Sequence, residues 1–323
     1  MNYVVFDLEW NQSMTREWED ARMPFEIIEI GAVKLDSKYN IIDEYQSLIK
    51  PRLYKKLQPH VKSILNYDEQ ELRNGRPFDM VCREFLKWCG QDYTFCSWGS
   101  MDLHYLQMNM EYYHMKPLVS PLKFYNIQQI YANLIDQEHL IVKLEKAVEN
   151  LNISFDENRP YHSAVNDAYY TSLVFGKMKP KDVDDLYCFD TYNNPKEKED
   201  EIITFHKKYL EHISHEYSDK REILDDKDFS SIMCYKCGKK ANKKIKWFSN
   251  TPTSYTCVGK CWYHGYVVGK IKVKQTKNGK LFAIKTMSPS DRKGLEKVKE
   301  RQNELREKRL IKRHDKIKVK QPL

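Results

Sequence analysis

Five residues in a fixed order most constrain what this chain can fold into, because together they are the parts of one kind of chemical site. They are the carboxylates Asp7, Glu9, Asp102 and Asp167, and His162. Carboxylate oxygens are the ligands that hard cations such as Mg²⁺ prefer, and two such ions can stabilise the attacking and the leaving oxygen of a phosphodiester displacement. A neighbouring imidazole can act as a general base near neutral pH. The set predicts a metal-dependent hydrolytic site.

The carboxylates stand at predicted junctions of secondary structure. Residues 2–10 are predicted to form a strand, in which side chains alternate between faces, so Asp7 and Glu9 point to the same side. Two adjacent carboxylates repel each other unless a cation lies between them. A second strand is predicted over residues 93–98, and the helix that follows carries Asp102 in its first turn.

A helix predicted over residues 164–178 places Asp167 one turn inside it and His162 on a loop just before it. Each residue alone has an ordinary explanation. A D-x-E pair can be a solvated strand edge, Asp102 a first-turn acid stabilised by the helix dipole, and His162 a surface loop residue. The order of all five residues, each beside such a junction, favours the functional interpretation.

The pattern D-x-E, then W-G-x-x-D, then H-x-A-x-x-D resembles that of the DnaQ-like, or DEDDh, 3′→5′ exonucleases. Residues 26–33 (E-I-I-E-I-G-A-V) resemble the second strand of this family, and residues 85–89 and 144–151 resemble the helices before its second and third motifs. Together with residues 98–103, these segments are most similar to the branch that contains histone-mRNA and small-RNA 3′ exonucleases and KapD-type proteins. The resemblance covers about residues 1–180.

The resemblance implies an RNase H-like α/β fold, with a mixed five-stranded sheet and helices on both sides. It implies two Mg²⁺ or Mn²⁺ ions, one held by Asp7, Glu9 and Asp167, and the other by Asp7 and, through water, Asp102. It also implies that His162 is the general base. We therefore expect an enzyme that removes nucleotides from a 3′ end.

One departure from the family concerns the residues after the first motif. Proofreading members usually continue with small Thr and Gly residues that touch the terminal nucleotide, whereas Trp10, Asn11 and Gln12 follow here. This difference argues against a polymerase proofreader. Trp10 and Trp98 are candidate substrate contacts.

A second set of residues has the spacing of a zinc ribbon. Cys234 and Cys237 are followed after nineteen residues by Cys257 and Cys261, and four thiolates complete a tetrahedral site for one structural Zn²⁺. The three-residue gap in the second pair is less standard, and His264 could replace one sulfur. The alternative is a set of free buried cysteines.

The charge of the chain is divided unevenly. Residues 1–230 carry a formal −12 and residues 231–323 carry +20, which together give the net +8. A zinc-ribbon-like β module over residues 229–288, with aromatic residues among its lysines, suits single-stranded nucleic acid, although the aromatic residues could simply form its core. The candidate contacts are Lys243, Lys244, Lys246 and Trp247.

The remaining segments are predicted as connections. Residues 181–228 are expected to be a helical linker with an amphipathic helix, on which His212 and His215 could share a metal but are more simply placed on a solvated face. An Asn-Gly turn at residues 278–279 predicts a β-hairpin. Residues 289–323 are predicted to be a basic helical tail.

No run of 18 apolar residues is present, and the chain starts with a strand rather than a signal peptide. We therefore expect a cytoplasmic protein without membrane partners, monomeric by default. The predicted function is metal-dependent 3′→5′ hydrolysis of single-stranded RNA that releases 5′-mononucleotides. The alternatives are a DNA exonuclease of the same chemistry and an inactive nucleic-acid-binding scaffold.

Overall fold

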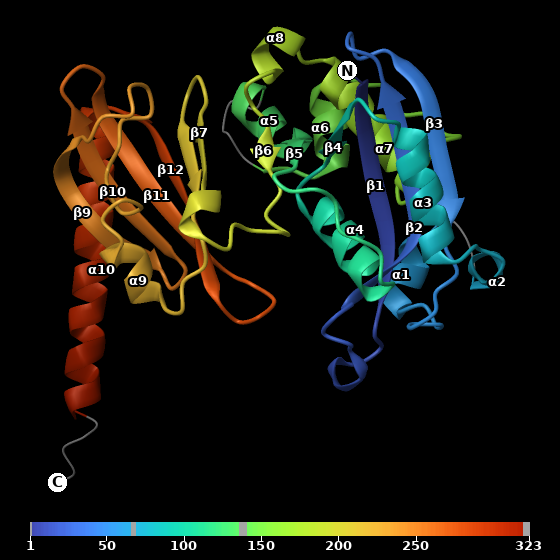
Figure 1. Ribbon diagram of the computed structural model, residues 1–323, viewed down its shortest axis with the longest axis horizontal. Helices are drawn as coiled ribbons and strands as arrows, with labels where there is room; N and C mark the ends of the chain where they lie inside the picture. Colours follow the sequence, from blue (N-terminus) through green and yellow to red (C-terminus); the bar gives the residue numbers. More distant parts are fainter. Residues whose placement is uncertain (1, 66–68, 136–140, 319–323) are drawn as a thin grey trace. The chain divides into compact units, whose positions relative to one another are not determined.

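Figure 1 shows the computed structural model, which describes residues 2–65, 69–135 and 141–318, with the side chains of the last helix described as far as residue 311. The chain divides into two compact units, unit 1 (Met1–Asn193) and unit 2 (Asn194–Leu323). Residues 194–228, predicted as part of a linker, therefore belong to unit 2.

A mixed six-stranded sheet, in the order β3-β2-β1-β4-β5-β6, forms the centre of unit 1. Strands β1, β2 and β3 are antiparallel neighbours, β4 and β5 run parallel to β1, and β6 is antiparallel to β5. The strands are β1 (Asn2–Gln12), β2 (Phe25–Leu35), β3 (Ile41–Leu48), β4 (Tyr93–Ser97), β5 (Lys123–Asn126) and β6 (Cys188–Phe189). The predicted α/β fold is confirmed. The predicted count of five strands omitted β6, whose two residues are too few to leave a pattern in the sequence.

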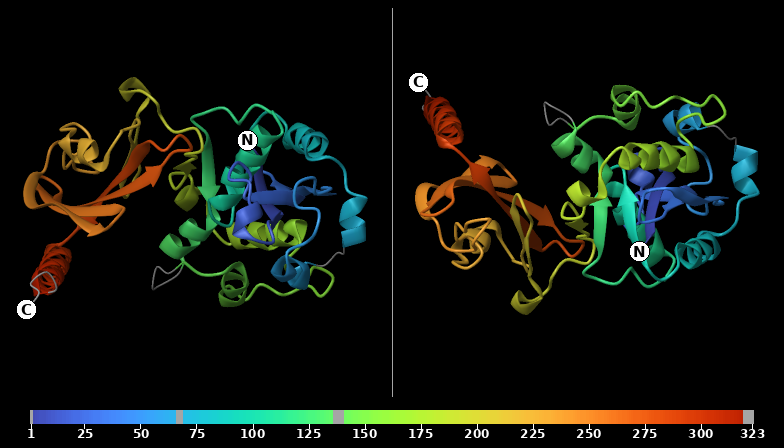
Figure 2. Two further views of the ribbon diagram at one scale, coloured as in Figure 1. Left: turned by 90° about the horizontal axis from the view of Figure 1, so that it is seen from below. Right: turned by 90° about the horizontal axis from the view of Figure 1, so that it is seen from above.

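Helices cover both faces of this sheet, as the two views of Figure 2 show. Helices α5, α6 and α7 share one apolar core with Tyr3 and Val5 of β1, and α3 and α4 share the other with Val4, Phe6 and Leu8. The helices are α1 (Pro59–Ile64), α2 (Glu69–Arg73), α3 (Phe78–Cys89), α4 (Met101–Tyr112), α5 (Ile127–Leu134), α6 (Leu144–Asn150), α7 (Ala164–Gly176) and α8 (Pro180–Val183), with a 3₁₀ turn, η1 (Arg16–Trp18).

The alternation of β1 decides which core its carboxylates face. Tyr3 and Val5 pack on the side of α7, and Asp7 and Glu9 continue the same row because side chains two apart share a face. The strand predicted over residues 2–10 is thus confirmed, and its two acids point toward α7.

Helix α7 passes directly over β2 at Gly31, the residue paired with Asp7 in the β1–β2 ladder. A Cβ atom at Gly31 would lie 1.9 Å from the backbone nitrogen of Val165 and 2.1 Å from the carbonyl carbon of Ala164. Only glycine therefore allows this approach, which brings the first turn of α7 to the carboxylates of β1.

Unit 2 is built on an antiparallel six-stranded sheet in the order β7-β8-β12-β11-β10-β9. Its elements are η2 (Lys198–Asp200), β7 (Ile202–Phe205), β8 (Leu210–Ile213), α9 (Lys220–Asp225), β9 (Asn242–Thr251), β10 (Ser254–Cys261), β11 (Gly265–Gln275), β12 (Leu281–Ser290) and α10 (Arg292–Lys318). The zinc-ribbon-like β module predicted from residue 229 is therefore part of a larger sheet.

The amphipathic helix predicted within residues 196–217 is wrong, because this segment forms the β7–β8 hairpin. The apolar spacing of three and four residues arises from two short strands joined by a turn, in which the N–H of His206 donates to the carbonyl of Tyr209. The β-branched run Ile202-Ile203-Thr204 is the signal that favoured a strand.

Two other predictions for the C-terminal part are confirmed. Strands β11 and β12 form a hairpin, whose turn holds Gly279 at a φ of +80°. The basic tail is helical as α10, and its half-buried stripe packs onto the sheet through Leu295, Val298 and Leu305; residues 319–323 of the tail lie outside the described residues. In the part of the chain that the structure covers, no helix is long and apolar enough to cross a membrane.

We predict that Gly31→Ala destabilises unit 1 by at least about 3 kcal/mol, since the new methyl group meets backbone atoms that cannot move aside. Gly176→Ala in α7 is the matched control, because nothing lies within 4 Å of its Cβ position. The control should be neutral or gain about 0.5 kcal/mol. Thermal unfolding of both variants tests this, and equal melting temperatures would contradict the close approach of α7 to β2.

Candidate active site and metal-binding clusters

The five residues predicted from the sequence meet beside the C-terminal half of β1. The carboxylate of Asp7 lies within the electrostatic influence of Glu9, Asp102 and Asp167. Glu9, His162 and Asp167 each offer a ligand atom, and these atoms lie within 4.8 Å of one another. Side chains from β1, α4 and α7, and the loop before α7, thus converge on one site.

Asp102 reaches this site from the first turn of α4, and it is only 5% exposed. Strands β1 and β4 pair in register only as far as Val5 and Cys96. Beyond that point Asp102 lies close enough to Asp7 for its charge to raise the pKa of that carboxylate. Ser100 stands at the N-cap position of α4 but makes no side-chain capping bond.

His162 is an exposed loop residue with a φ of +66°, in the left-handed region that side chains other than glycine rarely adopt. On a continuous helix, two residues five positions apart would point in different directions. The left-handed residue turns the chain before α7, and the N–H of His162 then donates to Oδ2 of Asp167 over 3.2 Å. The turn explains how both side chains join the group with Glu9.

Glu29 is a buried carboxylate at this site that the sequence pattern did not reveal. It pairs with Glu9 across the β1–β2 ladder and is 0% exposed. Its oxygens accept hydrogen bonds from the N–H of Ala164 (3.0 Å) and the hydroxyl of Ser163 (3.2 Å), where α7 begins. Glu29 therefore fixes the start of α7 on the sheet. The available signal was a lone acid within the apolar run that follows residue 26.

Burial and mutual repulsion raise the pKa values of the carboxylates at this site when no cation is present. Burial raises the pKa of Asp7 well above its ordinary value, and the neighbouring Asp102 and Asp167 raise it further. Burial and the neighbouring acids raise the pKa of Glu9 to about 8. Burial also raises the pKa values of Asp102 and Asp167 to about 7.

A divalent cation fits these residues. Oδ1 of Asp167 is buried and has no hydrogen-bond partner among the described residues, so its lone pairs are available to a cation. All of the carboxylate donors are hard oxygen atoms, which suit Mg²⁺ or Mn²⁺ better than softer metals. Positive charge between them would remove the mutual repulsion that raises their pKa values.

The two tryptophans predicted as substrate contacts lie beside the site and are half-buried. Trp10 packs against Phe25 and Tyr105, with ring centroids 5.8 and 5.2 Å away. Trp98 lies 6.0 Å from the ring of Tyr131, and its buried Nε1 has no partner in the described part of the chain. Both rings help to form the apolar cores, and their contact with substrate stays a prediction.

A second cluster, in unit 2, has the donors and spacing of a zinc site. Ligand atoms of Cys234, Cys237, Cys261 and His264 lie within 4.8 Å of one another. The Sγ atoms of Cys237 and Cys261 are 3.8 Å apart, and Sγ of Cys234 is 3.5 Å from Nδ1 of His264. A tetrahedral ion with Zn–S bonds of about 2.3 Å has S–S edges of about 3.8 Å. The four atoms are spaced as ligands of one zinc ion.

Each of the two ligand pairs of this cluster is followed by a glycine with a positive φ. Cys234 and Cys237 precede Gly238, at a φ of +67°, and Cys261 and His264 precede Gly265, at a φ of +76°. Although burial opposes it, hydrogen bonds from the N–H groups of His264 and Tyr263 lower the pKa of Cys261 to about 6, which favours the thiolate that binds metal.

The prediction that Cys257 is a ligand is wrong, because the structure puts His264 in its place. Cys257 and Cys261 both belong to β10, and four residues of strand separate their Cα atoms by about 13 Å. Two sulfurs so far apart cannot bind one ion. Cys257 is instead buried opposite Gly269 in the core of unit 2. The missed signal was the repeated spacing, C-x2-C-G and then C-x2-H-G.

The predicted nucleic-acid contacts of unit 2 lie on β9, the edge strand of its sheet. Lys243, Lys244 and Lys246 are exposed there. Trp247 is half-buried in the core, and its Nε1 donates to the carbonyl of Ser230 over 2.6 Å. The structure thus gives Trp247 a packing role and leaves the three lysines accessible to a ligand.

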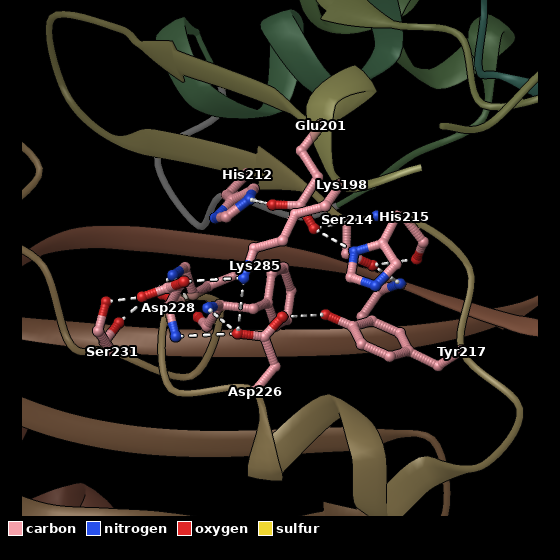
Figure 3. A network of polar contacts seen from close by, with 12 residues as sticks. Lys198, Glu201, His212, Ser214, His215, Tyr217, Asp226, Asp228, Ser231 and Lys285 are labelled. Atoms are coloured by element: carbon pink, nitrogen blue, oxygen red, sulfur yellow. Dashed lines mark hydrogen bonds and ion pairs between the residues drawn. The ribbon is translucent and has the colours of Figure 1, made fainter. Parts of the chain in front are cut away.

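A third group of possible metal ligands, Glu201, His215 and Asp226, lies in unit 2 and is shown in Figure 3. Glu201 joins two histidines: its oxygens are 2.7 Å from Nε2 of His212 and 2.6 Å from Nδ1 of His215. Ligands about 2.1 Å from a tetrahedral ion would be about 3.4 Å apart, so these shorter contacts are hydrogen bonds.

Positive charge already balances the acids of this network. Lys198 forms ion pairs with Asp226 and Asp228, and the buried Lys285 donates to the carbonyls of Phe229 and Ser231. Burial opposes ionisation of Glu201, but hydrogen bonds from its two histidines lower its pKa to about 2. The network is structural, and His212, expected on a solvated helix face, is buried within it.

Comparison with known proteins agrees with the geometry of unit 1. The sequence model of the RNase_T family, described as Exonuclease, matches residues 4–175. The chain is 26% identical over 153 residues to the probable 3′-5′ exonuclease KapD of Bacillus subtilis (strain 168), covering 46% of this chain and 71% of KapD. It is 24% identical over 120 residues to the PolC-type DNA polymerase III of Streptococcus sanguinis (strain SK36), covering 37% of this chain and 8% of that protein. The nuclease domain of 3′hExo bound to rAMP, a DEDDh family member, is 22% identical with a TM-score of 0.48, covering 55% of this chain and 90% of that one.

The raised pKa values predict how stability depends on pH without divalent cations. Unfolded carboxyl groups lose their protons near pH 4, but Asp102 and Asp167 keep theirs to about pH 7 and Glu9 to about pH 8. Because the folded state then binds more protons than the unfolded state, stability should fall as the pH rises from about 4 to about 8.

Calorimetry of the zinc-loaded protein at pH 5.5 and pH 8.5 measures this loss, and each kcal/mol corresponds to about 2–4 °C. Asp102→Asn should reduce the loss, and 5 mM Mg²⁺ should abolish it. Asp79→Asn on α3, a surface carboxylate paired with Arg83, is the control and should change nothing. A melting temperature that does not depend on pH would contradict the clustering of these acids.

The zinc content of variants distinguishes the two possible ligand sets, four cysteines or three cysteines with His264. We expect about one zinc per chain in the wild type, loss of zinc in Cys237→Ser and His264→Ala, and retention in Cys257→Ala. Elemental analysis of protein purified without chelator measures this content. Zinc retained by His264→Ala but lost from Cys257→Ala would show that the four cysteines bind the ion and that His264 does not.

Proposed function

Because the chain belongs to the RNase_T family of exonucleases, as a 3′→5′ exonuclease of the DEDDh type, we propose that its substrate is single-stranded RNA. Hydrolysis from the 3′ end would release 5′-mononucleotides. The observation that carries the proposal of activity is the convergence of Asp7, Glu9, Asp102, His162 and Asp167 beside the C-terminal half of β1.

RNA is proposed as the substrate because the segment around the second motif, residues 98–103, resembles the RNA-directed branch of the family. DNA hydrolysis by the same chemistry is the alternative, and the same residues would perform it. The intact set of five side chains argues against the third possibility, an inactive scaffold.

The residues of the site would divide the reaction between them. Asp7, Glu9, Asp102 and Asp167 would hold two Mg²⁺ or Mn²⁺ ions, which, when bound, supply the positive charge that stabilises the attacking and leaving oxygens. His162, exposed beside Glu9 and Asp167, would accept the proton of the water that attacks the last phosphodiester. The bond from phosphorus to the 3′ oxygen of the preceding nucleotide then breaks. Because His162 is open to solvent, it can release the proton afterwards.

Supporting residues keep these groups in place. The N–H of His162 donates to Asp167, and Glu29 fixes the start of α7, which carries Asp167. Precise placement of this kind lowers the entropy cost of bringing reacting groups together. Glu29 is thus a positioning residue in this proposal rather than a group that touches the substrate.

Unit 2 supports binding of a polyanion. Between residues 229 and 290 the sequence contains 13 lysines and no aspartate, glutamate or arginine. Such a concentration of positive charge binds phosphates without regard to base sequence and loses affinity as salt is added. We propose that unit 2 binds the strand that unit 1 shortens.

The activity is tested with end-labelled single-stranded RNA and DNA of one sequence, in Mg²⁺ or Mn²⁺, resolved on a gel. We expect stepwise shortening from the 3′ end and faster hydrolysis of RNA. Asp7→Asn and Asp167→Asn should abolish turnover because each replaces a negatively charged ligand of the ions that carry the reaction by a neutral amide. His162→Ala should reduce the rate by a factor on the order of 10² to 10⁴.

His60→Ala, an exposed histidine on α1, is the matched control and should keep wild-type activity. Faster hydrolysis of DNA would replace RNA by DNA as the substrate and leave the site assignment standing. Full activity in both aspartate variants would overturn the site itself.

A further inference from the structure

Two aromatic side chains of unit 2 lie almost entirely in solvent. Trp262 is 84% exposed and Tyr263 is 72% exposed. Tryptophan and tyrosine gain much of their stabilising effect from burial, and the other tryptophan of unit 2, Trp247, is half-buried in the core. A neighbouring pair of large, exposed rings is typical of a surface that contacts a partner.

The chain holds this pair outward. Trp262 and Tyr263 occupy the turn between β10 and β11, directly between Cys261 and His264. The flanking side chains point to the metal cluster, and Gly265 closes the turn with a φ of +76°. With both neighbours held in the cluster, the two rings cannot turn into the core. Their exposure therefore belongs to the fold of the turn and does not come from a frayed segment.

Lysines lie near the turn that carries the two rings. Nζ of Lys239 lies 5.3 Å from the centroid of the Tyr263 ring, and Nζ of Lys260 lies 5.2 Å from that of Tyr266, on the other side of the turn. Lys236 and Lys240 are exposed on the first turn of the cluster. The nearest acids in the sequence are Asp228 and Asp291, well outside the turn.

A partner for this surface must offer both negative charge and flat aromatic faces. Single-stranded nucleic acid does so, because each nucleotide carries one phosphate and one base whose face is open for stacking. In a duplex the faces of the bases are covered by their neighbours. An acidic protein segment would match the lysines but not the pair of rings.

We propose that Trp262 and Tyr263 form a stacking platform for bases of single-stranded nucleic acid, with Lys239 and Lys260 contacting the adjoining phosphates. The proposal rests on the proposed function only in its choice of nucleic acid as the partner of unit 2. It adds a base-contacting site to the phosphate contacts of β9, and it predicts that binding depends on the bases as well as on charge.

The test uses the full-length, zinc-loaded protein with Asp7→Asn, so that the probe is not degraded. Two probes of equal charge are compared by fluorescence anisotropy: a single-stranded decanucleotide and an abasic chain of ten sugar phosphates. The double variant Trp262→Ala/Tyr263→Ala should bind the decanucleotide about tenfold more weakly or worse, because stacking contributes that much for one base. Its affinity for the abasic chain should change by less than about twofold.

Matched variants separate stacking from folding. Trp262→Phe/Tyr263→Phe retains two aromatic faces and should keep most of the affinity for the decanucleotide. Leu310→Ala, which removes an exposed apolar side chain from α10, should bind both probes as the wild type does. Unchanged zinc content and melting temperature in the alanine double variant exclude loss of the turn.

Equal losses on the two probes, or no loss on either, would overturn the stacking platform. The outcome is independent of catalysis, because binding is measured in a variant without turnover. Protein that fails to shorten RNA but shows the base-dependent loss would contradict the proposed function and leave this inference intact. Protein that shortens RNA but shows no base-dependent loss would contradict the stacking platform and leave the proposed function intact.

Discussion

Repulsion between like charges is the constraint on which the arrangement of unit 1 depends. Asp7, Glu9, Asp102 and Asp167 lie together where burial and their own negative charges oppose ionisation. A protein keeps such a site only if the surrounding fold holds it in place. Here the glycine at position 31 lets α7 lie against the sheet, and backbone N–H groups and Glu29 fix the acids and the helix that approach β1. Divalent cations bound between the carboxylates would remove this repulsion, so the site suits the ions that its family uses.

Much of unit 1 could be predicted from the sequence, because its signals are local. The alternation of β1 placed Asp7 and Glu9 on one face, and the strand–glycine–helix order after residue 93 placed Asp102. Glu29 could not be assigned in this way, since its role depends on a contact with residues 163 and 164, more than 130 positions away. The strand β6 is set by pairing with β5 rather than by its own two residues.

Unit 2 shows where local patterns mislead. Apolar residues at intervals of three and four suggested a helix, but they belong to two strands of a hairpin. His212 of β8 and His215, which follows β8, form hydrogen bonds with Glu201. Cysteine spacing identified three ligands of the zinc-type cluster and left His264 as an alternative to the fourth cysteine, because counting residues ignores the length of an extended strand. Once Cys257 is placed on β10, geometry excludes it and His264 completes the set. The turn that carries His264 also carries the exposed rings, so one local feature serves both a metal site and a binding surface.

The most direct test of this account is anomalous diffraction from crystals of the zinc-loaded protein soaked in Mn²⁺, with data collected at the manganese and zinc edges. The account predicts manganese peaks in contact with the carboxylates of Asp7, Glu9 and Asp167, and one zinc peak between Cys234, Cys237, Cys261 and His264. It predicts no peak at Glu201. Manganese absent from the C-terminal half of β1, or bound instead between Glu201, His215 and Asp226, would contradict the assignment of the active site.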